Sequence, residues 1–212
     1  MSELCRVYWY PLYAYARRAG RSPEDAEDLT QGFLLALLRR NSLAGTSREK
    51  GKLRSFLLAS LKNFMRDEWR KANQEKRGGR QTIVSIDLQS SEDRYARMLV
   101  DKMTPEKAYD RLWVFALLDE VMKQFSDECE EKGKLPLLLK AAPYLNMDVD
   151  DRCPYAEFAA EFGLTESGIR VAVHRLRARY RELLRERIAD TLASEDGLDE
   201  ELSYLMSLFE RG

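Results

Sequence analysis

Residues 165–183 read "TESGIRVAVHRLRARYREL" and carry five arginines and the only histidine of the chain. Apolar or aromatic residues recur in this stretch at helical spacing: Ile169, Ala172, Val173, Leu176, Tyr180 and Leu183. At 100° per residue they fall within an arc of roughly 100°, which predicts a helix with one buried face. The polar side chains fall on a second arc, so the same helix presents a basic ridge.

The residues just before this helix predict a second, shorter helix and a tight turn. The stretch "YAEFAAEFGL" places Ala159 four residues before Gly163, and Thr165 suits a helix N-cap. A helix-turn-helix needs such a small residue where its helices cross and a glycine at the turn. Its second helix would present to a DNA major groove Thr165, Ser167, Arg170, His174, Arg177 and Arg181. The alternative is an arginine-rich helix whose charges are simply solvated.

Nearly all other apolar patterns also have the helical period, which predicts an all-α protein. Residues 82–88 are the one weak strand candidate, and they are too isolated to form a sheet. We expect two small helical domains joined by a linker, the C-terminal one carrying the helix-turn-helix. The expected segments are an N-terminal domain over 1–77, a linker over 78–104, a C-terminal domain over 105–190 and an acidic tail helix over 191–212.

Charge is segregated along the chain although the formal net charge of its 212 residues is only −1. Residues 1–80 carry a net charge of +8 and residues 154–189 one of +2, whereas residues 81–153 carry −5 and residues 190–212 carry −6. Two basic blocks favour contact with a polyanion at two places. The acidic tail has two possible partners: it folds back on a basic domain when the protein is free, or it packs permanently on the C-terminal domain.

Several classes of protein are disfavoured by the sequence. Cys5, Cys129 and Cys153 are too few and too irregularly spaced for a disulfide framework or a zinc site. There is no phosphate-binding loop and no cluster of metal ligands, so we expect no enzyme activity, no cofactor and no metal. No apolar run is long enough to span a bilayer and the N-terminus lacks a signal peptide, so we expect a cytoplasmic protein.

Two N-terminal helices carry further candidate surfaces. The first, over 22–40, begins with Ser22 as its N-cap and buries Ala26, Leu29, Phe33, Ala36 and Leu37. Its opposite stripe combines carboxylates with an exposed leucine, Leu35, which suggests a protein partner with a basic surface. A solvated acidic face with a stray leucine is the alternative.

The second of these helices, over 53–73, is expected to bury Leu53, Phe56, Leu57, Leu61 and Phe64. Its other side carries Lys62, Arg66 and Arg70, flanked by Asn63 and Trp69. Cations beside an aromatic ring and an amide suit single-stranded nucleic acid, because the ring stacks on bases and the charges meet the backbone. The alternative is that Trp69 belongs to the core and the basic residues are solvated.

Three stretches in order resemble a known family. They are "SPEDAEDLTQGFLLALL" from Ser22, "KGKLRSFLLASLKNFMRDEWRK" from Lys50 and the helix-turn-helix. Together they resemble the extracytoplasmic-function (ECF) group of bacterial sigma-70 RNA polymerase sigma factors, over about residues 4–77 and 110–188. The resemblance implies a specificity subunit that binds core polymerase, recognises the −10 and −35 promoter elements and helps to open DNA.

The resemblance also implies residue roles. The residues expected to dock on the clamp helices of the largest polymerase subunit are Asp25, Asp28, Gln31 and Leu35. Asn63 would read a flipped −10 base, and the strand would lie along Lys62, Arg66, Trp69, Arg70 and Lys71. The helix-turn-helix would read the −35 element, with the polymerase flap as a further partner of the factor, and the linker would thread near the RNA exit path.

Two questions stay open at this point. Regulation could come from an anti-sigma factor or from a contact with the acidic tail. The alternative function is a helix-turn-helix transcriptional regulator that binds duplex DNA without being a polymerase subunit. Only a sigma factor needs the acidic face and the single-strand surface together, and binding to core polymerase would separate the two.

Overall fold

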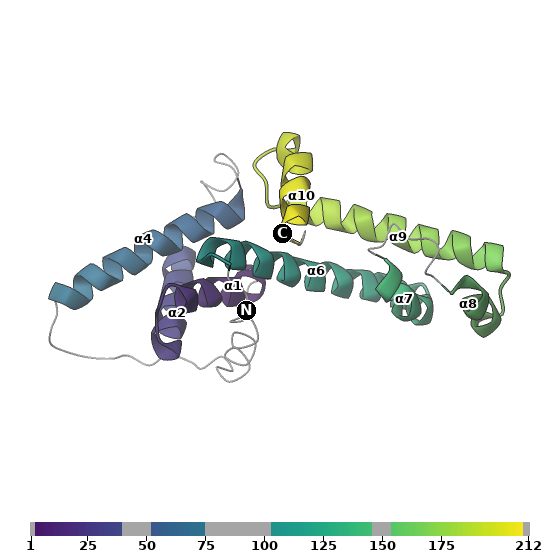
Figure 1. The fold of residues 1–212 in the computed structure, drawn as a ribbon, viewed down its shortest axis with the longest axis horizontal. Helices are drawn as coiled ribbons and strands as arrows, with labels where there is room; N and C mark the ends of the chain where they lie inside the picture. Colours follow the sequence, from purple (N-terminus) through teal and green to yellow (C-terminus); the bar gives the residue numbers. More distant parts are fainter. Residues whose placement is uncertain (1–2, 40–51, 75–102, 146–153, 210–212) are drawn as a thin grey trace. The chain divides into compact units, whose positions relative to one another are not determined.

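The computed structural model describes residues 3–39, 52–74, 103–145 and 154–209, and it is helical wherever it is regular (Figure 1). The helices are α1 (Glu3–Arg18), α2 (Pro23–Arg39), α4 (Leu53–Gln74), α6 (Pro105–Glu131), α7 (Leu135–Ala141), α8 (Tyr155–Phe162), α9 (Glu166–Ala189) and α10 (Leu198–Ser207), with short 3-10 turns at Ala142–Tyr144 and Glu195–Gly197. The all-α prediction is confirmed, and the described residues contain no strand. The strand candidate at 82–88 and nearly all of the predicted linker lie outside them.

The chain divides into two compact units. The first combines residues 1–116 with residues 189–212, and the second comprises residues 117–188. Helix α6 therefore contributes to both, although the sequence grouped all of it with the C-terminal domain. Its first half joins the first unit because Ala108, Tyr109 and Trp113 are fully buried there.

Local signals in the sequence set the ends of the first two helices. Gly20 adopts a left-handed conformation, with φ of 88°, and ends the turn that follows α1. The Ser22 hydroxyl accepts a hydrogen bond from the Asp25 backbone N–H at 3.1 Å, which confirms the predicted N-cap of α2. Together they turn the chain so that α2 packs against α1.

The core of the first unit agrees with the predicted apolar stripes in part. On α2, Ala26, Phe33 and Leu37 are buried as expected, whereas Leu29 is only half-buried. On α4 the buried set is shifted, and consists of Arg54, Leu57, Leu58, Leu61 and Met65. The shift arises because α4 contacts α2 on one side and the first half of α6 on another. Its buried residues therefore cover a wider arc than a single apolar stripe.

A buried ionic cluster, the Arg54 network, joins three helices of the first unit. The Arg54 guanidinium donates from Nε to Glu201 Oε1 at 2.8 Å and forms a second ion pair with Asp110 of α6. Lys52 approaches Glu201 at 2.5 Å, and Tyr204 donates to Asp110 at 2.5 Å. Arg54 is 6% exposed and Glu201 only 1%, so each charge is stabilised by its ion-pair partners instead of by water.

The Arg54 network places the acidic tail helix against the beginning of α4. Glu201 and Tyr204 belong to α10, and α10 is part of the first unit. Of the two alternatives for the tail, contact with the basic N-terminal domain is the one that the structure contains. The contact involves Arg54 and Lys52, at the beginning of α4.

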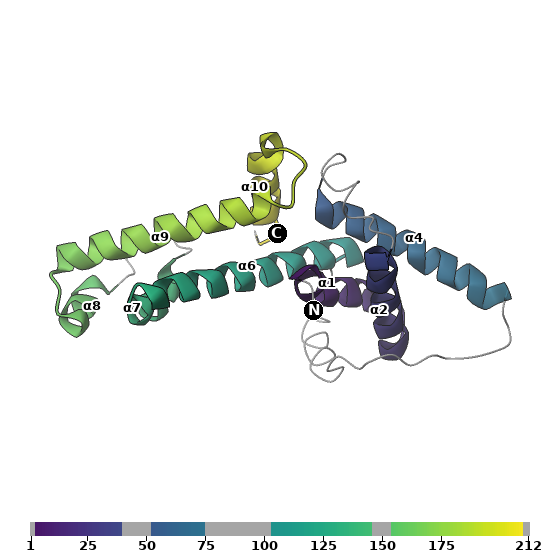
Figure 2. The same cartoon turned by 180° about the vertical axis from the view of Figure 1, so that it is seen from behind.

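The second unit is formed by residues 117–131 of α6 together with α7, α8 and most of α9. Phe125 packs on Tyr180 with ring centroids 6.1 Å apart, and Arg179 binds both carboxylate oxygens of Glu128 at 2.8 and 3.0 Å. A tight turn joins α8 to α9 (Figure 2). Gly163 adopts a left-handed φ of 63° there, as the predicted turn requires.

The Arg54 network predicts a large stability effect from a single substitution. Arg54→Met should lower the free energy of unfolding by about 3–5 kcal/mol, because it leaves the Glu201 carboxylate buried without its main partner. Urea unfolding followed by circular dichroism measures the change. Lys71→Gln, which removes an exposed pair with Glu68, should cost less than about 1 kcal/mol. Equal losses in the two variants would contradict the assignment.

Candidate nucleic-acid interface

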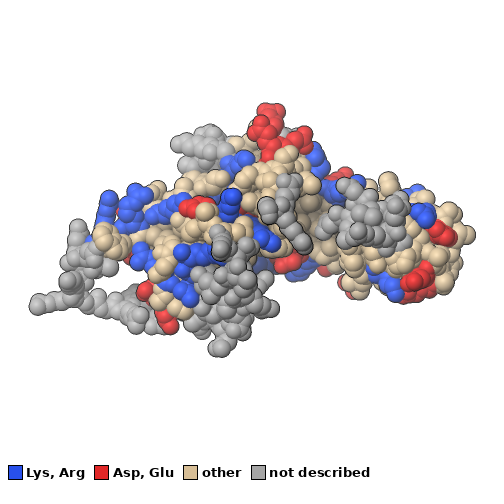
Figure 3. Space-filling model, in the orientation of Figure 1, with Lys and Arg blue, Asp and Glu red and all other residues tan. Residues whose placement is uncertain are grey.

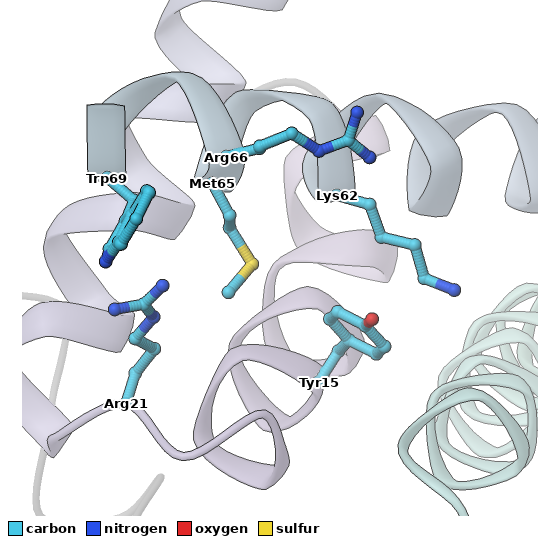
Figure 4. A pocket seen from close by; sticks show the side chains of 6 residues that line it. All are labelled: Tyr15, Arg21, Lys62, Met65, Arg66 and Trp69. Atoms are coloured by element: carbon cyan, nitrogen blue, oxygen red, sulfur yellow. The ribbon is translucent and has the colours of Figure 1, made fainter. Parts of the chain in front are cut away.

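A hollow of about 350 Å³ lies between the C-terminal half of α4 and the turn that joins α1 to α2 (Figure 4). It is lined by Tyr15, Arg21, Lys62, Met65, Arg66 and Trp69, and we refer to it as the Trp69 pocket. The four residues from α4 recur at i, i+3, i+4 and i+7, which places them along one flank of the helix. The turn at Gly20 delivers Arg21 to the opposite wall.

Trp69 is 57% exposed, so the alternative in which it belongs to the core is wrong. The Arg21 side chain points toward the indole ring from across the pocket (Figure 4). Its buried Nε has no hydrogen-bond partner among the described residues. The exposed indole ring is therefore available to a ligand, and the Arg21 guanidinium adds positive charge beside it.

Lys62 sets the electrostatics at the other end of the pocket. Its Nζ lies 5.5 Å from the centre of the Tyr15 ring and 2.8 Å from Oε1 of Glu106, the second residue of α6. The hydrogen bond to Glu106 raises the pKa of Lys62 and lowers that of Glu106. Burial is the main cause of the raised pKa of the Tyr15 hydroxyl. The pocket is therefore cationic, with one carboxylate at its edge.

This combination suits a single-stranded nucleic acid. Two arginines, a lysine and two aromatic rings line the pocket, and none of its lining residues is acidic. Bases stack on exposed aromatic rings, and arginine and lysine bind the backbone phosphates. Lys and Arg side chains also gather over α4 in the face shown in Figure 3.

The six residues predicted for the −10 element lie on two flanks of α4. Lys62, Arg66 and Trp69 line the Trp69 pocket. The other three residues of α4 line a second hollow of about 620 Å³, and they are Asn63, Arg70 and Lys71. Side chains of α2 line the same hollow. That hollow also contains Asp67 and Glu68, and Glu68 pairs with Lys71 at 2.8 Å. The second flank is thus less cationic than the first.

The acidic face predicted for α2 is present. Asp25 and Asp28 are exposed, Gln31 is half-buried and Leu35 is 40% exposed. The Gln31 amide donates to Glu27 Oε1 at 3.0 Å. Leu38 is also exposed, one turn beyond Leu35, and sequence reasoning missed it. Two exposed leucines beside carboxylates favour a protein partner over plain solvation.

The ridge on α9 differs from its prediction at one position. Exposed as expected are Thr165, Ser167, Arg170, His174 and Arg181. The Thr165 hydroxyl accepts the Gly168 N–H at 3.1 Å, which confirms the N-cap. The predicted exposure of Arg177 is wrong: its side chain is buried and donates from Nε to the Tyr144 carbonyl at 3.1 Å. Its guanidinium satisfies an acceptor at a helix end, which a helical projection cannot show.

Three lining or ridge residues were missed by sequence reasoning. Arg175 is exposed on α9 beside His174. Tyr15 and Arg21 come from another helix and a turn, so spacing along α4 carried no signal for them. No group of three or more His, Cys, Asp and Glu side chains among the described residues is arranged to hold a metal ion. None of the described helices is long and apolar enough to cross a membrane.

Residues 8–75 match the family model of Sigma-70 region 2. The matched segment contains all of α2 and α4 and every residue that lines the Trp69 pocket. The match supports an RNA polymerase sigma factor of the sigma-70 family, a non-enzymatic factor of transcription initiation, and implies interaction with core RNA polymerase and promoter DNA. No curated protein and no solved structure matches the chain.

The exposure of Trp69 predicts that binding and stability separate at this residue. Trp69→Ala should change the free energy of unfolding by less than about 0.5 kcal/mol. It should weaken binding to a labelled single-stranded oligonucleotide by about 1–3 kcal/mol, because a stacking platform is lost. Fluorescence anisotropy and urea unfolding measure the two effects. Leu61→Ala, at a fully buried position of the same helix, should instead lower the free energy of unfolding by about 2–5 kcal/mol.

Proposed function

We propose that the chain is an RNA polymerase sigma factor of the ECF group, which docks on core polymerase through α2 and holds the opened −10 strand on α4. The observation that carries this proposal is the coincidence of the Sigma-70 region 2 match with two different surfaces. One is acidic with exposed leucines, and the other is cationic and aromatic. A simple duplex-DNA regulator needs neither surface.

The polymerase contact is assigned to the exposed stripe of α2. Asp25, Asp28 and Gln31 precede Leu35 and Leu38 on that helix, so carboxylates lead and apolar side chains follow. Such a stripe fits a partner with basic side chains around an apolar patch. In the family that the sequence resembles, the matching helix docks on the clamp helices of the largest polymerase subunit.

The −10 strand is assigned to the outer surface of α4. At 100° per residue the order around the helix is Trp69, Lys62, Arg66, Arg70 and Asn63. A strand that begins in the Trp69 pocket therefore crosses Arg66 and Arg70 before it reaches Asn63. The pocket would supply affinity, and the Asn63 amide would read a base edge at the far side.

The −35 element is assigned to α9, with Arg170, His174 and Arg175 toward the bases or phosphates. A helix-turn-helix regulator that never joins polymerase would use this surface alone. Titration of core polymerase with the labelled chain separates the two functions, because only a sigma factor forms a stable complex with it. The absence of such a complex would contradict the sigma-factor proposal.

Asp28→Arg should weaken the complex with core polymerase by about 2 kcal/mol, or about 30-fold, because it reverses a charge at the centre of the proposed contact. Asp119→Arg is the matched control: Asp119 is an exposed acid on α6, outside that contact. The control should bind as the parent chain does. Equal affinities for all three proteins would remove α2 from the interface.

Asn63→Ala should leave binding to core polymerase unchanged and alter the base preference within the −10 element. A lost base contact should reduce discrimination at one position by about 1–3 kcal/mol. Transcription from a library of −10 sequences measures the preference at each position. If parent and variant use the library identically, Asn63 does not read a base.

A further inference from the structure

The Arg54 network lies at the opposite end of α4 from the Trp69 pocket, and helix α6 links the two places. Glu201 of α10 and Asp110 of α6 both bind the Arg54 guanidinium. Tyr204 of α10 bonds to the same Asp110 at 2.5 Å. Helix α10 therefore holds the first half of α6 as well as the beginning of α4.

The protonation states of Glu201 and Tyr204 favour the contacts that α10 makes with Arg54 and Asp110. Burial raises the pKa of Glu201, but hydrogen bonds and charge from Arg54 and Lys52 outweigh it, so the pKa lies below its ordinary value. Burial and the bond to Asp110 raise the pKa of Tyr204 to about 12. At neutral pH the carboxylate is thus charged and the phenol remains a donor.

Further contacts fix α6 on either side of Asp110. The Tyr109 hydroxyl donates to the Arg54 carbonyl at 3.0 Å. Beyond Asp110, Phe115 meets Phe209 edge to face, with ring centroids 5.3 Å apart, and the Arg111 guanidinium lies within 6.0 Å of both rings. Removing α10 and the residues that follow it would take away the Glu201, Tyr204 and Phe209 contacts together.

The first turn of α6 reaches the edge of the Trp69 pocket. Glu106 lies one turn before Asp110, and its carboxylate binds Lys62 at 2.8 Å. Both side chains of this pair are substantially exposed, so the pair is weak by itself and a phosphate could displace the carboxylate. Because Glu106 belongs to α6 and Lys62 to α4, the pair depends on the position of α6 against α4.

We propose that α10 is a latch: by holding the first half of α6 against α4, it keeps Glu106 on Lys62 and lowers the affinity of the pocket for single-stranded nucleic acid. This inference rests on the proposed function of the pocket. It differs from competition by the charge of the tail as a whole, because the buried acidic side chain of α10, Glu201, binds Arg54 and Lys52 rather than the pocket. Figure 3 shows the remaining acidic side chains of this region gathered on the surface over α10.

The test is binding of the full chain and its variants to a fluorescein-labelled oligothymidine of about 20 nucleotides, at low and moderate salt. Truncation before Leu198 and the substitution Glu106→Gln should each raise affinity about fivefold. Combining the two should raise it no further, because both release the same lysine. Glu200→Gln, which removes an exposed charge from α10, should leave the affinity unchanged.

Different results identify which claim fails. If Trp69→Ala binds as tightly as the parent chain, the pocket assignment fails and the latch fails with it. If Trp69→Ala weakens binding but neither Glu106→Gln nor the truncation strengthens it, the latch alone is overturned. An additive gain from the two changes, or an equal gain from Glu200→Gln, would also overturn it in favour of general charge. Glu106→Gln alters only an exposed pair, so it should not affect folding. Tyr204→Phe removes a single contact between α10 and α6, and it loosens α10 less than truncation does.

Discussion

The buried charge of Arg54 constrains much of the first unit. A guanidinium this far from water is stable only when carboxylates surround it, and its two carboxylates come from α6 and α10, 56 and 147 residues farther along the chain. Helices that are distant in sequence must therefore meet at the beginning of α4. This is why the last helix of the chain belongs to the same compact unit as the first.

This constraint divides α4 into two parts with different roles. Its beginning is buried and ionic and serves the fold, whereas its second half exposes Trp69, Arg66 and Arg70. A helix fixed at one end by charge and along its middle by Leu57 and Leu61 can present a rigid row of side chains at the other. Rigid presentation favours binding, because little conformational entropy remains to be lost.

Local features were predictable from the sequence. The Ser22 and Thr165 caps, the turn at Gly163 and the helical character of the chain follow from propensity and spacing alone. The candidate pocket was half predictable: Lys62, Arg66 and Trp69 share a helix, while Tyr15 and Arg21 arrive through tertiary packing. The burial of Arg54 was not predicted, and the predicted exposure of Arg177 was wrong, for the same reason. A helical projection treats every arginine as exposed, and it contains no information about a distant carboxylate or carbonyl that satisfies a buried one.

The central claim is that this chain directs polymerase to promoters. The most direct measurement is transcription in vitro by core RNA polymerase on genomic DNA, with and without the chain, followed by mapping of the RNA 5′ ends. The account predicts new start sites that depend on the chain and share one motif near −10 and another near −35. Identical start sites with and without the chain, at concentrations that saturate core polymerase, would contradict it.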